Sequence, residues 1–268
     1  MPSWLPAPGV PEMTDVLVCV KRVPDDSGEV VLNEAGDAVD GRYAGYTMSA
    51  HEECAVEIAV DIAGESGGEV TVLSLGEEDC VEQLRAAVAV GAHTAVRIDA
   101  PADAFGPGDV AAAIASAVRE KEAGGTSYDL VLLGNDAADT GDHQVGIRLA
   151  HLLERPVVAG AQTIRVTQGR AEVRADSATG TEVYELPLPA VATVLEGGVQ
   201  PRYPTITGRM RAKKTPIDVL EPGVDPRGNG RLGLRVLPPP ESQVEVLGQG
   251  EGAAVRLAQL LRELGVLR

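Results

Sequence analysis

The chain has 268 residues, of which 23 are Lys or Arg and 40 are Asp or Glu, so its formal net charge is −17. This length suits one large domain or two small ones and is sufficient to bury a hydrophobic core. The acidity argues against a general nucleic-acid binder and against a polybasic membrane-surface protein, because both need a basic surface.

The N-terminal residues and the cysteines help to predict the cellular compartment in which the protein is found. We expect residues 1–12 to form a disordered tail without the basic region of a signal peptide, and Met1 and Met13 both stay candidates for the native start. Cys19, Cys54 and Cys80 are too few and too scattered for a disulfide framework or a zinc site. An odd number of cysteines suits a reducing compartment, and no apolar run has the length of a membrane helix. A cytoplasmic location is therefore expected.

From residue 13 to residue 156, short apolar runs alternate with helical patterns. The apolar runs predict buried strands at residues 16–20, 70–75, 94–98 and 129–133. Helices are predicted at residues 49–62, 78–90, 109–121 and 143–153, with a hairpin or loop at residues 28–47. Ser49 and Glu52 fit a capping box at the first helix, and Asp109 is expected to cap the third. Continuous apolar strands separated by helices predict an α/β fold, with a parallel sheet covered on both faces.

The pattern changes after Pro156. Alternating segments at residues 162–168, 171–175 and 181–186, joined by turn signals, predict β-hairpins, and a further strand follows at residues 190–195. Pro and Gly between residues 201 and 233 predict little regular structure, and residues 252–266 predict an amphipathic helix. We therefore expect an α/β domain over residues 13–200. Residues 201–268 are expected to form an arm that lays the last helix on a partner or on the far side of the domain.

The sequence contains no Gly-rich phosphate motif, nucleophile motif or metal-ligand spacing, so neither a catalytic nor a metal site is predicted. The best local candidate is the loop after the strand at residues 129–133, which lies at the same sheet edge as Gly76. Its candidate ligand-binding residues are Gly134, Asn135, Asp136, Asp139, Thr140, Gly141, Asp142, His143, Gln144 and Val145.

This loop has two interpretations. Backbone N–H groups and the following helix N-terminus favour a phosphate. Its three Asp residues argue against a bare anion, unless they hold ribose hydroxyls or a cation. The alternative is an ordinary loop in which Asp serves as a turn and cap residue.

A basic stretch interrupts the acidic sequence near residue 200. Residues 199–216 contain five basic side chains and no acidic one, namely Arg202, Arg209, Arg211, Lys213 and Lys214. Such a stretch is either a solvated loop or a surface that attracts a partner or phosphates through its local field.

Several runs together resemble the electron transfer flavoprotein β-subunit family. They are Val16–Val23, Gly91–His93, Asp139–Gly146, Leu188–Val194, Pro201–Pro204 and Ala212–Ile217, in that order. The resemblance extends from Met13 to Arg268. It implies an adenine-nucleotide hydrolase-like, Rossmann-like sheet, and a heterodimer with an α subunit that holds most of an FAD. It also implies structural AMP in the β subunit, or a second FAD in electron-bifurcating relatives.

The resemblance also assigns residues. The nucleotide-site positions are Cys19, Ser49, Ala50, His51, Glu52, Leu75, Gly76 and the loop Gly134–Val145. The segment that docks the partner dehydrogenase corresponds to Leu195, Glu196, Gly197, Gly198, Val199, Gln200, Pro201 and Arg202. Asp176 matches the family's acidic residue near the flavin at the subunit interface. Such a subunit carries electrons from a flavin dehydrogenase to a quinone oxidoreductase and makes no bonds itself.

The sequence departs from the family pattern at several positions, which indicates a divergent branch. Ser49, Ala50 and His51 stand where many members have Asn-Pro and an aromatic residue. Pro24, Asp25 and Asp26 follow the first strand, where the family has an aromatic residue near the flavin. Two other classes of protein have the same type of sheet and are alternative interpretations of the sequence. They are a stand-alone nucleotide-binding protein of the universal-stress type, and a nucleotide-hydrolysing or adenylating enzyme.

Overall fold

The computed structural model describes residues 13–267, except residues 26, 28–29, 239–243 and 245. The disordered tail that we expect at residues 1–12 lies outside these described residues. The chain divides into two compact units, and the boundary falls between Leu234 and Arg235.

In the described part of the chain, the first unit contains a nine-stranded sheet in the order β11-β5-β4-β1-β6-β10-β7-β8-β9. Its strands are β1 (Val16–Cys19), β4 (Val70–Leu75), β5 (Thr94–Ile98), β6 (Leu130–Gly134), β7 (Val157–Thr167), β8 (Arg170–Ser177), β9 (Gly180–Pro187), β10 (Ala190–Val194) and β11 (Ile217–Leu220). The pairs from β11 to β7 are parallel, and β7, β8 and β9 are antiparallel. The predicted α/β fold class is confirmed.

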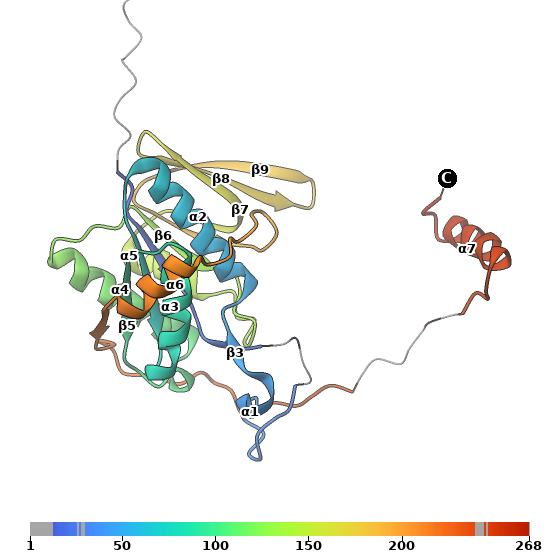
Figure 1. The fold of residues 1–268 in the computed structure, drawn as a ribbon, viewed down its shortest axis with the longest axis horizontal. Coiled ribbons are helices and arrows are strands. Elements are labelled where there is room, and N and C mark those ends of the chain that lie inside the picture. Colours follow the sequence, from blue (N-terminus) through green and yellow to red (C-terminus); the bar gives the residue numbers. More distant parts are fainter. Residues whose placement is uncertain (1–12, 26, 28–29, 239–243, 245, 268) are drawn as a thin grey trace, which may run out of the picture. The chain divides into compact units, whose positions relative to one another are not determined.

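Helices cover both faces of the sheet (Figure 1). Helices α2 (Ala50–Ser66), α3 (Val81–Val90) and α6 (Ile206–Lys214) share one hydrophobic cluster, and α4 (Pro107–Ala123) and α5 (Val145–Leu153) share the other. Strand β1 contributes side chains to both clusters, because successive side chains of a strand point to opposite faces of the sheet. Val16 and Val18 are in the first cluster, whereas Leu17 and Cys19 are in the second.

Two predicted helix starts need correction. Helix α4 begins at Pro107, whose fixed φ suits the first helical position, and Asp109 lies in the first turn instead of at the cap. Its carboxylate accepts a hydrogen bond from the N–H of Gly106. Helix α5 begins at Val145, because His143 has a φ of 51° and cannot be part of it. The capping box of Ser49 and Glu52 on α2 is present as predicted.

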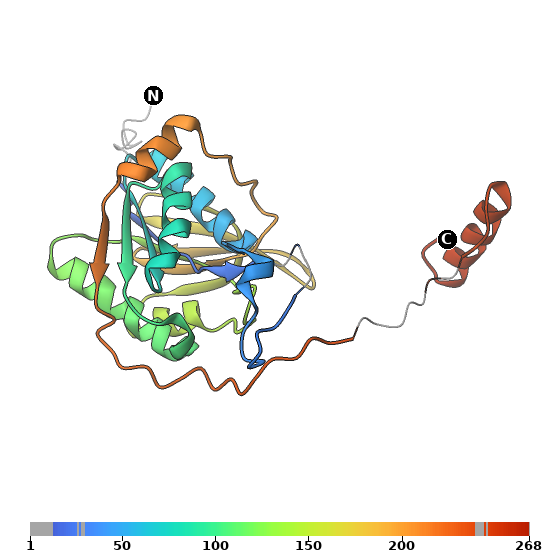
Figure 2. The same ribbon diagram turned by 60° about the horizontal axis from the view of Figure 1, so that its bottom comes forward.

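The prediction of little regular structure between residues 201 and 233 is wrong for two elements. Thr205 caps α6 by accepting a hydrogen bond from the N–H of Gly208, and the helix packs on α3 through the buried Ala212. Strand β11 then pairs in parallel with β5 and forms the outer strand of the sheet (Figure 2). Helix α6 is short and rich in basic residues, and β11 has only four residues, so their sequences carry little periodic signal.

The remaining elements are small or separate. Residues 28–47 include the short helix α1 (Gly41–Ala44) and strand β3 (Tyr46–Thr47), which pairs with β2 (Val23–Pro24). Short 3-10 turns occupy Glu78–Cys80 and Ala102–Ala104. The second unit contains helix α7 (Glu251–Glu263), which has no buried residue. None of the helices in the described residues is long and apolar enough to cross a bilayer.

Candidate nucleotide-binding site

The parallel strands β4, β1, β6 and β10 are neighbours, so their carboxyl ends meet at one edge of the sheet. Cys19, Leu75 and Gly134 end their strands at this edge. The helix that follows β1 lies on one face of the sheet, and the helix that follows β6 lies on the other. The edge between β1 and β6 is therefore a topological switch point, which is where ligands of open α/β sheets bind. The nucleotide-site residues predicted from the sequence gather here.

Glu52 joins the end of β1 to the start of α2. Its Oε1 accepts a hydrogen bond of 2.8 Å from the N–H of Lys21, and its Oε2 accepts one of 3.1 Å from the N–H of Ser49. Burial raises the pKa of this carboxyl group to about 8. Because both oxygens bond to the chain itself, Glu52 positions the backbone of the site.

Gly134 and Gly146 allow close approaches at the two ends of the loop. A Cβ on Gly134 would lie 2.9 Å from Cγ of Glu52 and 3.2 Å from Cβ of His51. A Cβ on Gly146 would lie 2.3 Å from Cγ2 of Thr193. The loop can therefore rest on α2 and on β10 only where these side chains are absent.

Polar contacts hold the loop between these glycines. Asn135 donates its N–H to the carbonyl of Val194 at 2.8 Å and accepts a hydrogen bond of 2.6 Å from the hydroxyl of Thr193. His143 lies 3.3 Å from Asn135 through Nδ1 and 3.3 Å from Asp136 Oδ2 through Nε2. Asp139 accepts a 2.7 Å hydrogen bond from Nζ of Lys21, which ties the loop to the end of β1.

The loop retains a polar atom without a partner. Oδ1 of Asp136 is buried and has no hydrogen-bond partner among the described residues. A buried acceptor of this kind is suited to a donor from a ligand, such as a ribose hydroxyl. Cys19 offers no nucleophile beside it, because burial, together with the charge of Glu52, raises the pKa of its thiol. No group of three potential metal ligands is found in the described residues.

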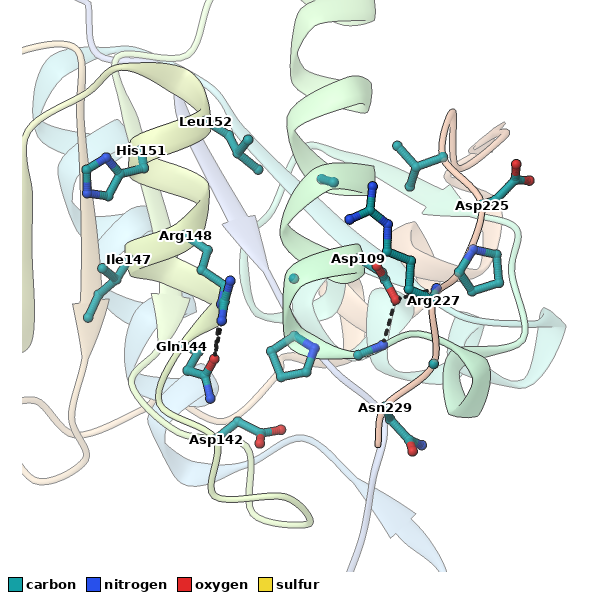
Figure 3. A pocket seen from close by; sticks show the side chains of 17 residues that line it. Asp109, Asp142, Gln144, Ile147, Arg148, His151, Leu152, Asp225, Arg227 and Asn229 are labelled. Atoms are coloured by element: carbon teal, nitrogen blue, oxygen red, sulfur yellow. Dashed lines mark hydrogen bonds between the residues drawn. The ribbon is translucent and has the colours of Figure 1, made fainter. Parts of the chain in front are cut away.

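A groove of about 1100 Å³ continues from the loop (Figure 3). It lies between the N-terminal part of α4, helix α5 and residues 224–229, and it includes Asp142 and Gln144 of the loop. Sequence reasoning missed the rest of this groove, because one wall comes from a segment that returns to the sheet edge after β11.

The docking segment predicted at residues 195–202 is tied to the body of the protein. Leu195 donates its N–H to the carbonyl of Ala161 at 2.8 Å, and Glu196 donates its N–H to Nδ1 of His51 at 2.9 Å. Arg202 forms a two-pronged contact with Glu57 on α2, with distances of 2.7–2.9 Å, and also pairs with Asp61. Arg202 is thus an internal anchor of the segment.

Exposed apolar side chains lie just beyond this segment. Tyr203 is 90% exposed, Ile206 81% and Met210 58%. Tyr203 precedes the Thr205 cap of α6, whereas Ile206 and Met210 are four residues apart on the helix, and all three lie within the basic stretch. Sequence reasoning missed them as a surface, although the i, i+4 spacing of Ile206 and Met210 was a usable signal.

Asp176 lies on a strand that is not adjacent to β6, the strand that precedes the loop. It is on β8, and β10 and β7 separate β8 from β6. Its side chain is exposed and accepts a 3.1 Å hydrogen bond from the hydroxyl of Thr181 on β9.

A parallel sheet with helices on both faces and a polar loop at its switch point defines an open α/β protein of the Rossmann-like class. Comparison with known proteins narrows this class. A family model described as "Electron transfer flavoprotein domain" matches residues 39–224. The chain is 31% identical over 258 residues to the electron transfer flavoprotein subunit beta of Bacillus subtilis, covering 92% of this chain and 97% of that protein.

Two further relatives agree with this result. Identity is 35% over 214 residues to the human electron transfer flavoprotein subunit beta, covering 78% of this chain and 81% of that protein. It is 31% over 208 residues to the caffeyl-CoA reductase-Etf complex subunit CarD of Acetobacterium woodii, covering 76% and 77%. The chain therefore belongs to the electron transfer flavoprotein family, and the resemblance to its β subunits is confirmed.

Proposed function

We propose that this chain pairs with an electron transfer flavoprotein α subunit and helps to enclose an FAD held mainly by that subunit. The heterodimer carries electrons from a flavin dehydrogenase to a quinone oxidoreductase, and this chain acts as a carrier subunit instead of an enzyme. Membership of the family supports this role. The three cysteines, which are free and buried, support a reducing, cytoplasmic location.

The β-subunit site binds AMP in a structural role. The observation that carries this proposal is Oδ1 of Asp136, a buried acceptor near the switch point of the sheet that has no partner in the described part of the chain. The nucleotide lies against Cys19, residues 49–52, Leu75, Gly76 and the loop Gly134–Val145. Backbone N–H groups near the N-terminus of α5 favour its negative charge.

Two further surfaces serve the protein partners. The segment at residues 195–202, held by α2, presents Tyr203, Ile206 and Met210 to the dehydrogenase, and their exposure supports this role. Helix α7 contacts the α subunit through its exposed Val255 and Leu257, together with the exposed Leu264 that directly follows the helix. Asp176 lies near the flavin at the subunit interface.

Nucleotide analysis of the co-expressed complex tests this function. The full chain is purified with its α subunit, denatured in acid, and the released nucleotides are quantified by chromatography. We expect AMP and FAD in equimolar amounts, and we expect Asp136→Ala to lower the AMP content while the FAD content is kept. Asp37→Ala, in an exposed turn far along the chain from the loop, is the matched control.

The other outcomes separate the alternatives. Two equivalents of FAD without AMP would support a subunit that binds its own FAD. Failure to form a complex with any α subunit, while the isolated chain still binds a nucleotide, would support a stand-alone nucleotide-binding protein.

A further inference from the structure

The groove between α4 and α5 brings together two cationic side chains from different walls (Figure 3). Arg148 extends from α5 toward the first turn of α4, and Arg227 comes from the segment that follows β11. Asp142 and Gln144 make the groove continuous with the loop of the proposed nucleotide site.

Arg148 is held in place by a neutral partner. Its Nε and Nη2 donate hydrogen bonds of 3.0 and 2.8 Å to Oε1 of Gln144. A Cβ on Gly108 would lie 3.7 Å from its Nη1, so the guanidinium group lies close to the backbone of α4. No carboxylate of the described residues forms an ion pair with Arg148. In a chain with a net charge of −17, this guanidinium keeps its full charge for a ligand.

The carboxylates that line the groove differ in whether they are available to a ligand. The carboxylate of Asp109 is already hydrogen-bonded within the chain. Its Oδ2 accepts hydrogen bonds from the backbone N–H groups of Arg227 at 2.8 Å and of Gly106 at 3.3 Å. Asp142 and Asp225 are exposed. Two free carboxylates disfavour a simple anion but suit a ligand that has hydroxyl groups as well as negative charge. A nucleotide combines both features.

We propose that this groove receives the phosphate end of the nucleotide and that Arg148 is its phosphate-binding cation. The inference rests on the proposed nucleotide site and adds a ligand-binding residue outside the loop. A guanidinium group held in one orientation can donate two parallel hydrogen bonds to phosphate oxygens. The first turns of α4 and α5 add positive potential at the same place. Arg227 contributes a second charge from the opposite wall.

Paired titrations with AMP and adenosine test this assignment. The complex of the full chain with its α subunit is freed of bound nucleotide and titrated calorimetrically with each ligand. Arg148→Gln is expected to weaken AMP binding by about 10-fold to 100-fold, the range of a charge-assisted hydrogen bond, and to leave adenosine binding unchanged. Arg148→Lys, which keeps the charge but loses the fork, is expected to be intermediate. Arg165→Gln, on the exposed face of β7, is the matched control.

Each other outcome has a definite meaning. An equal loss of AMP and adenosine affinity in Arg148→Gln would overturn the proposal, because Arg148 would then act only through the structure. Unchanged AMP affinity would also overturn it. If the unsubstituted protein binds neither ligand, the proposed nucleotide function fails and this inference fails with it.

Discussion

Glu52 is a carboxyl group that the fold has removed from water at the base of the proposed nucleotide site. It is 5% exposed, and both of its oxygens accept backbone N–H groups. These hydrogen bonds favour the ionised form, but the loss of hydration is larger and raises the pKa to about 8. The side chain therefore links β1 to α2 in a form whose charge depends on pH near neutrality.

This pKa predicts a pH-dependent stability. The ordinary pKa is about 4.5, so between about pH 4.5 and pH 8 the folded chain holds a proton that the unfolded chain has lost. The contribution of Glu52 to the free energy of unfolding is therefore fully present below pH 4.5. It falls as the pH rises, by at most about 1.4 kcal/mol per pH unit. Glu52→Gln should flatten this slope in urea unfolding at pH 6 and pH 8.

The control for this prediction is Glu65→Gln, which changes an exposed residue in the last turn of the same helix. Its slope should match that of the unsubstituted protein. If Glu52→Gln retained the full pH dependence, a different group would be responsible for it.

At the scale of elements, α2 serves two sites at once. Its N-terminal end, with Ser49 as the cap and Glu52 in the first turn, lies at the sheet edge. Other side chains of the helix bind the segment at residues 195–202. His51 accepts the N–H of Glu196, and Glu57 and Asp61 bind Arg202. Glu57 and Asp61 are four residues apart on α2, so these two side chains face the same way. The orientation of the exposed side chains beyond the segment therefore depends on α2.

The ion pair between Glu57 and Arg202 is expected to stabilise this arrangement. Glu57 is 7% exposed, so Arg202→Ala leaves a buried carboxylate without its guanidinium partner. Because Arg202 is itself partly exposed, we expect a loss of about 2 kcal/mol in the free energy of unfolding, below the range for fully buried pairs. Glu57→Gln combined with Arg202→Ala should cost less than the sum of the single changes. Denaturant titration of all four proteins measures this coupling.

Arg165→Ala is the matched control, because it removes an exposed arginine that forms no ion pair with the described residues. It should change stability by less than about 0.5 kcal/mol. Additive effects of the Glu57 and Arg202 substitutions would show that the contact contributes no net stabilisation.

At the scale of the whole molecule, the sequence predicts the central sheet well because its strands are continuous apolar runs. Strands β1, β4, β5 and β6 lie at or within one residue of the predicted ranges. Helix α6 and strand β11 were missed, because α6 buries only Ala212 and β11 has four residues. Both are stabilised by packing on distant elements, which local periodicity does not encode.

The candidate site was predictable where it follows the sheet. The loop after β6 carries its own signal, a buried strand followed by Gly and Asp. The groove beside it does not, because Arg148 and Arg227 are far apart in the sequence and line one groove only through the return of the chain after β11. Likewise, the role of Arg202 depended on Glu57, which sequence reasoning did not single out.

The division into two units predicts the effect of a truncation. In the described residues, every buried apolar side chain lies at or before Leu220. Removing residues 235–268 should therefore leave the thermal unfolding midpoint of the first unit within a few degrees of its original value. It should reduce the amount of α subunit that co-purifies, because the amphipathic face of α7 is lost. Equal recovery of the α subunit by the truncated chain would refute a role for α7 in assembly.

The strand order also determines when the sheet can be completed during synthesis. Strand β10 lies between β6 and β7 but is made after both, and β11 pairs with β5 more than a hundred residues after it. Until the ribosome has passed residue 194, the apolar edge of β6 has no partner on one side. Such late, non-local pairing slows folding and leaves an aggregation-prone edge exposed. The nascent chain therefore exposes this edge for longer than a simple alternation of neighbouring strands and helices would.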